Sequence, residues 1–233
     1  MDEIKNKRTV VLNRLKLLSI EMLIVLLAFL ISMVVVILII KEIIFKKKDS
    51  FDDAVFHYLE KTVSDQTTSV MKFFTIFGGQ YFLIPAYLFL IFYFFFIRKN
   101  KWLCIKITAV SLSSLVLMFL LKTIFQRPRP MIPLLKAARG LSFPSGHAFM
   151  SFSFFGLLIF IIHKEIHTPW LKYLLILLML GITFTVGLSR IYLRVHYASD
   201  VVAGFSMGFM WIVMSMSILR AIEKNNTSLP DVQ

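Results

Sequence analysis

The chain is short of the charged residues that a water-soluble protein of its length carries on its surface. Only 17% of its 233 residues are charged, whereas 58% are hydrophobic and 24 are phenylalanine. A soluble domain of this size has too little polar surface to cover so much apolar material. A soluble globular fold is therefore excluded as the first interpretation, and insertion into a membrane is expected.

Cysteine and acidic residues are also scarce. The single cysteine, Cys104, lies inside an apolar run, so an intramolecular disulfide is excluded. There are 13 acidic residues against 26 lysines and arginines, which gives a net charge of +13. On a soluble protein this charge would indicate nucleic acid as a partner. Here the basic residues occupy the short segments between apolar runs, so anionic lipid head groups and an anionic substrate are expected instead.

What the sequence has in abundance is long apolar runs. A helix needs about 20 consecutive apolar residues to cross a bilayer. Six stretches reach or approach that length: 17–40, 74–97, 102–121, 148–163, 170–188 and 198–219. The first is longer than the apolar core of a signal peptide and lacks a small-residue cleavage site, so we interpret it as a membrane anchor. The predicted fold is all-α, an integral membrane bundle of six transmembrane helices forming one domain over residues 1–225, with a flexible tail at 226–233.

A short helix is predicted on the membrane surface between the first two spans. Phe51, Val55 and Leu59 repeat at helical spacing, which is typical of an amphipathic helix lying at the interface, where it could border a site. The polar residues of the segment fall on other faces: Asp52, Asp53, His57 and Glu60. An ordinary surface helix with no functional role is an equally good interpretation of this pattern.

An even number of spans places both termini on the same side of the membrane. The 26 lysines and arginines divide equally, 13 to each side, and the balance tilts toward cytoplasmic termini only when three chemically required cations are set aside. We expect a multi-pass cell-membrane protein with cytoplasmic termini. Whatever the orientation, the span count brings the ends of the third and fifth spans and the starts of the fourth and sixth to one face.

Two histidines and an aspartate at that face have the pattern of a nucleophilic site. His196 and Asp200 are four residues apart, so a helix would place them on one side. A carboxylate that fixes one ring nitrogen leaves the other free to attack phosphorus, which would give a phosphohistidine. Ser145 in Pro144-Ser145-Gly146-His147 can cap the fourth span, Gly146 allows close approach of an anion, and His147 can donate a proton to a leaving oxygen. Simple helix caps with interfacial histidines are the alternative.

Three cations accompany these residues. Lys122 ends the third span, Arg129 lies between two prolines, and Arg190 ends the fifth span. Forked guanidinium donors suit tetrahedral oxyanions, and lysine adds a point charge. Taken singly, each cation would be assigned to lipid head groups. Four other basic residues are assigned in that way, although any of them could contact the substrate: Arg127, Lys136, Arg139 and Arg194. Packing or solvated turns account for a further four residues: His57, Cys104, His163 and His167.

Carboxylates are almost absent around these segments. Between Lys122 and Asp200 the only other one is Glu165, in a turn on the opposite face. Magnesium and calcium sites are built from carboxylate and carbonyl oxygens, and a zinc ion on His147 and His196 would lack a third protein ligand. We therefore expect chemistry that needs no metal and no other cofactor, with the three cations neutralising the substrate.

The ordered motifs resemble those of the type 2 phosphatidic acid phosphatase superfamily, a family of membrane lipid phosphatases. The pattern K-x6-R-P corresponds to Lys122 through Pro130, P-S-G-H to Pro144 through His147, and S-R-x5-H-x3-D to Ser189 through Asp200. The resemblance implies that His196 is the nucleophile, Asp200 orients it and His147 is the general acid. It also implies that the phosphate is bound by five residues: Lys122, Arg129, Ser145, Gly146 and Arg190.

By the same resemblance the catalytic face is extracytoplasmic and vanadate is an inhibitor. The expected activity is hydrolysis of a membrane lipid phosphate: undecaprenyl diphosphate, phosphatidylglycerophosphate or phosphatidate. Two alternatives share the same residues, a lipid phosphotransferase with the same intermediate and a non-enzymatic lipid-phosphate binder or transporter. Product analysis separates the first. The complete set of nucleophile, orienting carboxylate and acid argues against the second, because binding alone needs no pair of His196 and Asp200. The oligomeric state has no signature in the sequence.

Overall fold

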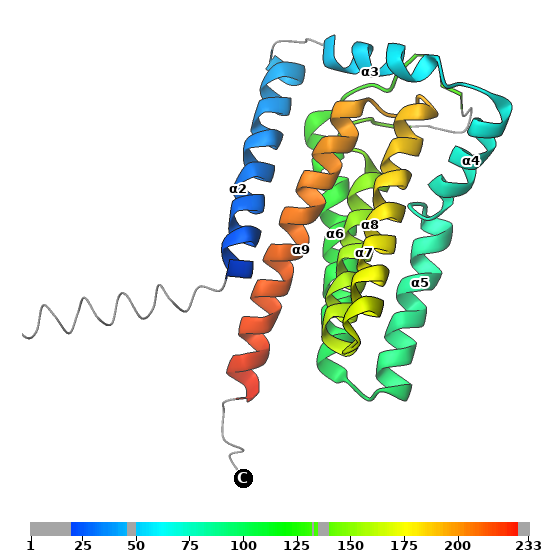
Figure 1. Cartoon of the computed structure of the whole chain (residues 1–233). Helices are drawn as coiled ribbons and strands as arrows, with labels where there is room; N and C mark the ends of the chain where they lie inside the picture. The colour runs from blue at the N-terminus through cyan, green and yellow to red at the C-terminus, as the bar shows by residue number, and fades with distance from the viewer. Residues whose placement is uncertain (1–19, 46–49, 132, 135–139, 228–233) are drawn as a thin grey trace, which may run out of the picture.

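The computed structural model describes residues 20–45, 50–131, 133–134 and 140–227, and all regular structure in these ranges is helical (Figure 1). The helices follow in the order α2 (Ile20–Ile40), the π-helical turn η1 (Lys41–Phe45), α3 (Ser50–Glu60), α4 (Asp65–Ile76), α5 (Gln80–Phe92), the π-helical turn η2 (Tyr93–Ile97), α6 (Lys101–Phe125), α7 (Gly146–Glu165), α8 (Pro169–Tyr192) and α9 (Ala198–Thr227).

Six helical stretches are long and apolar enough to cross a membrane, which confirms the predicted all-α membrane bundle. They cover 22–43, 65–97, 101–125, 146–165, 169–192 and 198–226. Each predicted run falls mainly within one of them, and residues 17–19 of the first run lie outside the described residues. Helix α9 continues to Thr227, two residues into the segment expected as the tail, and residues 228–233 lie outside the described part.

The second span is not one continuous helix, contrary to the expectation for 74–97. It consists of α4 and α5, separated at Gly78 and Gly79. A β-carbon on Gly78 would lie 2.5 Å from a methyl group of Val186 and 3.2 Å from His147. The two glycines therefore let the chain turn where it passes close to α7 and α8, and no larger residue fits at the first of them without displacing its neighbours.

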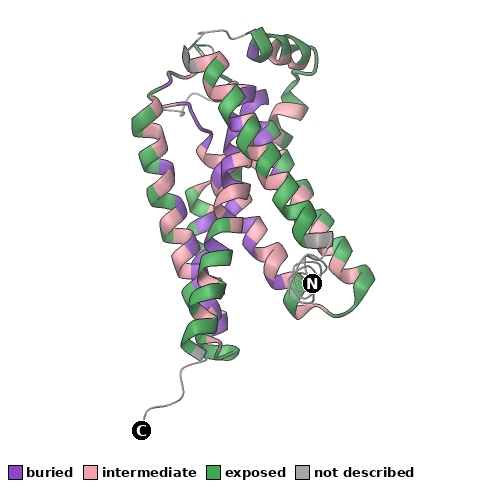
Figure 2. Ribbon diagram, turned by 90° about the vertical axis from the view of Figure 1, so that its left-hand side faces the viewer, coloured by how far each residue is buried: buried purple, intermediate pink, exposed green. Residues whose placement is uncertain are grey.

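Helix α7 lies at the centre of the bundle and contacts α5, α6, α8 and α9. The main core is built from aromatic and aliphatic side chains of α5, α6, α7 and α9, and it includes Tyr87, Ile107, Phe154 and Leu157. Figure 2 shows this buried material along the middle of the bundle and exposed residues on its outer surfaces. The exposed apolar side chains on the outside of the bundle form the surface that a bilayer covers.

Helix α2 has much less contact with protein than the other spans. In its most apolar stretch 6% of the residues are buried, against 39% for α6, α7 and α9. It packs along α9, and Val36 near its end joins a cluster with Met118 and Phe149. Figure 1 shows α2 at the edge of the bundle, beside α9. Most of its surface therefore faces lipid.

The predicted interfacial helix exists as α3. It lies across one end of the bundle, over the start of α9 and the end of α8 (Figure 1). Val55, Phe56 and Leu59 pack against a buried cluster that includes Ala148, Ile191 and Val201. This is the end of the bundle at which α6 and α8 finish and α7 and α9 begin, so the three polar segments meet beneath α3.

Candidate active site

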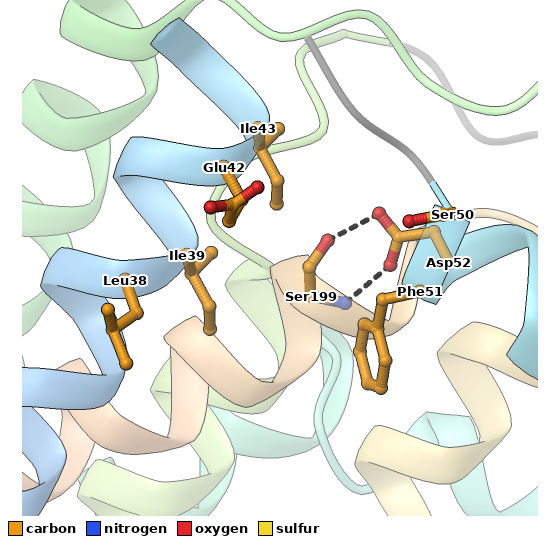
Figure 3. A pocket seen from close by; sticks show the side chains of 8 residues that line it. All are labelled: Leu38, Ile39, Glu42, Ile43, Ser50, Phe51, Asp52 and Ser199. Atoms are coloured by element: carbon orange, nitrogen blue, oxygen red, sulfur yellow. Dashed lines mark hydrogen bonds between the residues drawn. The ribbon is translucent and has the colours of Figure 1, made fainter. Parts of the chain in front are cut away.

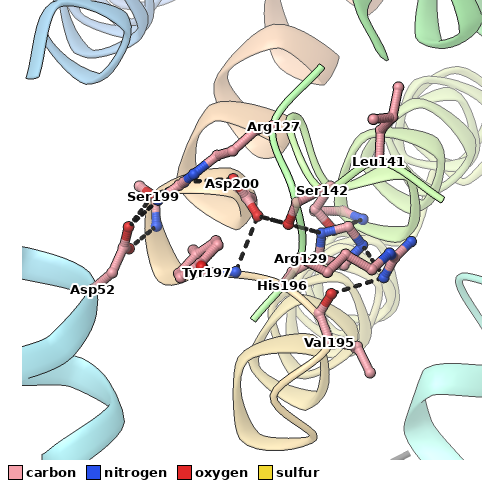
Figure 4. Close-up of polar contacts among 12 residues, drawn as sticks. Asp52, Arg127, Arg129, Leu141, Ser142, Val195, His196, Tyr197, Ser199 and Asp200 are labelled. Carbon is pink, nitrogen blue, oxygen red and sulfur yellow. Dashed lines mark hydrogen bonds and ion pairs between the residues drawn. The ribbon is translucent and has the colours of Figure 1, made fainter. Parts of the chain in front are cut away.

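The end of α6, the start of α7 and the connection between α8 and α9 bring the predicted site residues together. Figure 4 shows Arg129 and His196 side by side, with Ser142 and Asp200 on the other side of the imidazole. These residues come from the segment after α6, the segment before α7, the connection between α8 and α9, and the first turn of α9. Convergence of distant segments on one face, expected from the span count, is confirmed by their contacts.

The imidazole of His196 is buried and is held between a carboxylate and a guanidinium. Its Nδ1 atom lies 3.5 Å from Oδ2 of Asp200 and 3.4 Å from Oγ of Ser142. Its Nε2 atom lies 3.4 Å from Nη1 of Arg129. A proton on Nδ1 therefore faces Asp200, and the Nε2 lone pair faces the cationic side of the site.

Burial keeps this imidazole neutral. The low-polarity surroundings lower the pKa of His196 to about 4, and the nearby Asp200 only partly opposes this shift. The guanidiniums of Arg129 and Arg190 act in the same direction as burial. At neutral pH the ring is unprotonated on one nitrogen, which is the form that can act as a nucleophile.

Asp200 is fixed by several donors. Its Oδ2 atom accepts hydrogen bonds from the Ser142 hydroxyl and, at 3.0 Å, from the backbone N–H of Tyr197. Its backbone carbonyl accepts a hydrogen bond from the N–H of Ser145 at 3.0 Å. The last bond ties the start of α9 to the start of α7, and thereby ties the two histidine segments to each other.

Ser145 is the N-cap of α7, as predicted. Its hydroxyl accepts from the N–H of Ala148 at 3.5 Å. Gly146 follows, and a β-carbon there would lie 3.7 Å from Cε of Lys122. The Lys122 ammonium donates to the carbonyl of Leu141 at 2.7 Å. Lysine and the first amides of α7 thus lie next to each other, at the positive end of a helix dipole.

His147 lies in the first turn of α7, half-buried, against the break in the second span. A β-carbon on Gly79 would lie 3.6 Å from its Nε2 atom. The charges of Arg190, Arg129 and Lys122, and the ring of His196, all act on this imidazole. The two histidines and the three cations therefore share one electrostatic environment.

Arg190 is buried and is anchored by a residue that sequence reasoning missed. One terminal nitrogen donates to Oγ1 of Thr75 on α4 at 2.7 Å. Its Nε atom is buried without a hydrogen-bond partner within the described protein. A buried, unpaired donor on a cation is costly unless an anion completes it. The residue type of Thr75 carried no signal, since threonines in apolar helices are common.

The assignment of Arg127 to lipid head groups is wrong. The side chain is buried and bonded to Asp52 and Asp200, because it points into the bundle end rather than outward. Asp52 was placed on a polar face of the surface helix and is in fact 1% exposed. Ser142 was not identified at all. Arg127 pairs with Asp52 and Asp200, and Ser142 pairs with Asp200. The partners lie far apart in the sequence, so no local spacing could have shown these contacts.

The remaining assignments have mixed outcomes. Arg194 donates to Glu60 at 3.2 Å and lies over the ring of Phe56, so it contacts protein at the surface. Lys136 and Arg139 lie outside the described residues. Cys104 is buried in α6, with its thiol toward the carbonyl of Ile91.

A pocket of about 220 Å³ lies beside the site (Figure 3). It is lined by the end of α2 and η1, the first residues of α3 and Ser199. Its floor is the hydrogen-bonded pair of Asp52 and Ser199, and its walls are mainly apolar. Within the described part of the chain, no group of three metal-ligating side chains comes together.

Comparison with known proteins places these features in a family. The model of the PAP2 superfamily matches residues 102–224. Phosphatidylglycerophosphatase B of Bacillus subtilis (strain 168) is 32% identical over 144 residues, which cover 60% of this chain and 70% of that protein. The bacitracin transport permease protein BcrC of Bacillus licheniformis is 45% identical over 69 residues, 30% of this chain and 29% of that protein.

Two solved structures share the fold. The transmembrane PAP2-type phosphatidylglycerolphosphate phosphatase from Bacillus subtilis superposes with a TM-score of 0.72 at 26% identity, over 85% of this chain and 96% of that one. Aquifex aeolicus LpxE superposes with a TM-score of 0.57 at 25% identity, over 70% and 93%. The motif resemblance is confirmed by these matches: the chain belongs to the PAP2 superfamily of membrane phosphatases.

Proposed function

We propose that the protein removes a phosphate group from a membrane lipid through a covalent phosphohistidine on His196. The observation that carries this function is the orientation of that ring: Nδ1 faces the carboxylate of Asp200 and Nε2 faces the guanidinium of Arg129. A histidine that only stabilises a helix end needs neither partner. This arrangement is the one that a nucleophile for phosphorus requires.

In the first step Nε2 of His196 attacks phosphorus and the bond from phosphorus to the lipid oxygen breaks. His147 gives a proton to that oxygen as it leaves. Charge on the equatorial phosphate oxygens is balanced by Lys122, Arg129 and Arg190, together with the Gly146 amide and the Ser145 hydroxyl. The unpaired Nε of Arg190 is one donor that a phosphate oxygen would complete.

In the second step water attacks phosphorus and the bond to Nε2 of His196 breaks. His147, now unprotonated, takes a proton from the water, and inorganic phosphate leaves. Both histidines return to their starting state, so no other reactant is consumed. Throughout the cycle the carboxylate of Asp200 compensates the positive charge that appears on the imidazole.

The substrate proposed is a glycerophospholipid phosphate, with phosphatidylglycerophosphate the first to test. Two of the matched Bacillus subtilis proteins, one found by sequence and one by structure, carry that substrate in their names. The site lies at the end of a bundle whose outer surface is apolar, so a lipid can keep its chains in the bilayer while its head group reaches the cations. We also propose that residues 1–225 form one domain and that the catalytic end is extracytoplasmic, with cytoplasmic termini.

The test is a phosphate-release assay in reconstituted vesicles with a panel of lipid monophosphates and diphosphates. The wild-type protein is expected to release phosphate from phosphatidylglycerophosphate, and His196→Ala is expected to lose all turnover. Acid-labile, base-stable phosphate on the wild-type protein identifies the intermediate. Full activity of His196→Ala contradicts the covalent mechanism. Formation of a phosphorylated lipid in place of free phosphate would identify a phosphotransferase. The absence of turnover on every substrate would identify a non-enzymatic binder.

A further inference from the structure

We propose that Arg127 and Asp52 are positioning residues that hold Asp200, and through it the His196 nucleophile. The proposal rests on the phosphohistidine mechanism above and adds to it an element outside the family motifs. Arg127 stands at an unspecified position of the first motif, and Asp52 belongs to the surface helix α3. Figure 4 shows Arg127 between Asp52 and Asp200, on the side of Asp200 that faces away from His196.

Arg127 bridges the two carboxylates with the two ends of its guanidinium. Its Nη1 atom donates to Oδ1 of Asp200 at 2.8 Å and to Oγ of Ser199 at 2.9 Å. Its Nη2 atom donates to Oδ2 of Asp52 at 2.9 Å. The guanidinium carbon also lies over the ring of Tyr197, 3.8 Å from its centre. A planar cation held in this way defines the angle at which Asp200 presents its other oxygen.

Asp52 closes the arrangement from α3. Its Oδ1 accepts from the backbone N–H of Ser199 at 2.8 Å, and its Oδ2 accepts from the Ser199 hydroxyl at 2.6 Å. It thus acts on the first turn of α9, the helix that carries Asp200. A negative charge at a helix N-terminus is stabilising, and here it also balances Arg127.

All three charges are buried, so each of them depends on its partners for stabilisation. Asp52, Arg127 and Asp200 are 1%, 8% and 0% exposed. Removing one partner of a buried ion pair leaves an uncompensated charge in a poorly solvated place. Burial alone would lower the pKa of Arg127, but Asp200 and Asp52 together raise it, so the guanidinium stays charged.

The two carboxylate oxygens of Asp200 are held by different groups, which indicates the effect of removing Arg127. Oδ1 is held by Arg127, whereas Oδ2 receives the Ser142 hydroxyl, the Tyr197 N–H and the Nδ1 edge of His196. Without Arg127 the Oδ1 side of the carboxylate loses this donor, so the Ser142 hydroxyl and the Tyr197 N–H must hold the carboxylate by Oδ2, and its orientation toward the imidazole becomes less fixed. The anion-binding cations are not touched by this change, because Lys122, Arg129 and Arg190 have other partners.

The matched control is the other arginine–carboxylate pair that joins α3 to the same region. Arg194 donates to Glu60 at 3.2 Å, in the connection between α8 and α9, but neither residue contacts Asp200. Substituting that pair disturbs α3 docking and surface charge without disturbing the nucleophile. Arg194→Gln and Glu60→Gln are therefore compared with Arg127→Gln and Asp52→Asn.

The experiment measures kcat, KM and thermal stability of these variants in vesicles. For Arg127→Gln and Asp52→Asn we expect kcat to fall roughly 10- to 100-fold, as for other partners that orient an active-site ligand. KM is expected to stay within about twofold, because phosphate binding is unchanged. The control variants should keep wild-type kcat. Arg127→Lys should recover melting temperature but not kcat, since an ammonium cannot bridge both carboxylates in one plane.

Two results would overturn the positioning role. One is wild-type kcat in both Asp52→Asn and Arg127→Gln, and the other is a rise in KM with unchanged kcat. If Arg127→Gln does not fold, the near-isosteric Asp52→Asn decides the question alone. Failure of the phosphohistidine mechanism is separately visible, because it appears as turnover in His196→Ala with every other residue intact.

Discussion

The guanidinium of Arg190 donates a 2.7 Å hydrogen bond to the hydroxyl of Thr75, across the contact between α8 and α4. This bond joins a phosphate-binding cation to the half-helix that precedes the break at Gly78 and Gly79. It leaves the Nε side of the guanidinium directed elsewhere, with no partner in the described protein. Thr75 is therefore expected to aim Arg190 at the substrate.

Thr75→Val should weaken substrate use without removing it. The variant keeps the shape of the side chain but leaves a buried charged donor unpaired, a loss of about 1.5–3 kcal/mol when a hydrogen bond involves a charged group. We expect kcat/KM to fall by roughly tenfold or more. Thr75→Ser keeps the hydroxyl and should stay near wild type. Equal behaviour of the two variants would show that the hydroxyl has no part in aiming Arg190.

The pH dependence should reflect the buried state of His196. Groups facing this ring are Asp200, Ser142, Arg129, Arg190 and His147. Because its pKa is about 4, the ring stays neutral as the pH falls through 6.5, where an exposed histidine would gain a proton. The acid limb of kcat/KM that belongs to the enzyme should therefore lie below about pH 5.

Substrate ionisation is separated by using two substrates. A phosphomonoester loses its second proton near pH 6. This ionisation of the substrate could be mistaken for the titration of a histidine with an ordinary pKa. A limb near 6.5 that is the same for a monophosphate and a diphosphate lipid would contradict the low pKa of His196. The same shift has a folding consequence. Between about pH 6.5 and 4 the unfolded chain binds more protons at this position, so its contribution to stability falls as the pH is lowered.

Helix α9 should tolerate no side chain at Gly204. A β-carbon there would lie 2.8 Å from the carbonyl oxygen of Ser145, and one at Gly208 would lie 3.0 Å from that of Phe149. Small residues four apart allow helices to approach closely in membranes. Gly204→Ala should destabilise by about 1–3 kcal/mol through overpacking and reduce activity, because it separates α9 from the start of α7.

Gly181→Ala is the control for helix propensity. Apart from the backbone of its own helix, no atom of the described residues lies within 4 Å of the added carbon, so the substitution should be neutral or stabilising by about 0.5–1 kcal/mol. Thermal melts of both variants in the same detergent give the comparison. If Gly204→Ala melts at the wild-type temperature with full activity, the close contact of α7 and α9 is not required.

Orientation can be measured with single cysteines, because the chain has only Cys104. Met131 is 95% exposed at the catalytic end, and Lys99 is exposed at the opposite end. In a Cys104→Ala background, Met131→Cys should react with a membrane-impermeant maleimide in intact cells. Lys99→Cys should react only after the cells are permeabilised. The reverse pattern would place the catalytic end in the cytoplasm.

Activity is expected to survive metal removal and to be lost with vanadate. The three cations near His147 supply the charge that a metal ion would otherwise supply, so excess chelator should leave kcat within about twofold. Vanadate, a tetrahedral oxyanion with phosphate-like geometry, should compete with the lipid. Loss of turnover in chelator with recovery on added Mg²⁺ would require a different mechanism.

The sequence predicted the spans and the family residues because both depend on local patterns. Apolar runs of bilayer length define helices such as α7 whatever their neighbours are. Motif spacing likewise identified His147 and His196 without knowledge of the fold. The common membrane face of these residues followed from counting spans, which needs no side-chain detail.

What was missed depends on contacts between distant segments. Arg127 and Asp52 are 75 positions apart, and neither residue type distinguishes a buried ion pair from a snorkelling or solvated charge. Thr75 lies 115 positions from Arg190. The break in the second span did have a local signal, two adjacent glycines inside an apolar run, but the length of the run outweighed it.

The sparse protein contacts of α2 bear on how this enzyme is handled. Fatty acyl chains, rather than neighbouring helices, solvate most of its outer surface, so the environment supplied during purification becomes part of its tertiary structure. A detergent micelle replaces the flat layer of acyl chains with a smaller, curved layer of detergent tails. Nanodiscs of native-like thickness are therefore the suitable setting for kinetic work, because α2 borders the pocket whose floor includes Asp52.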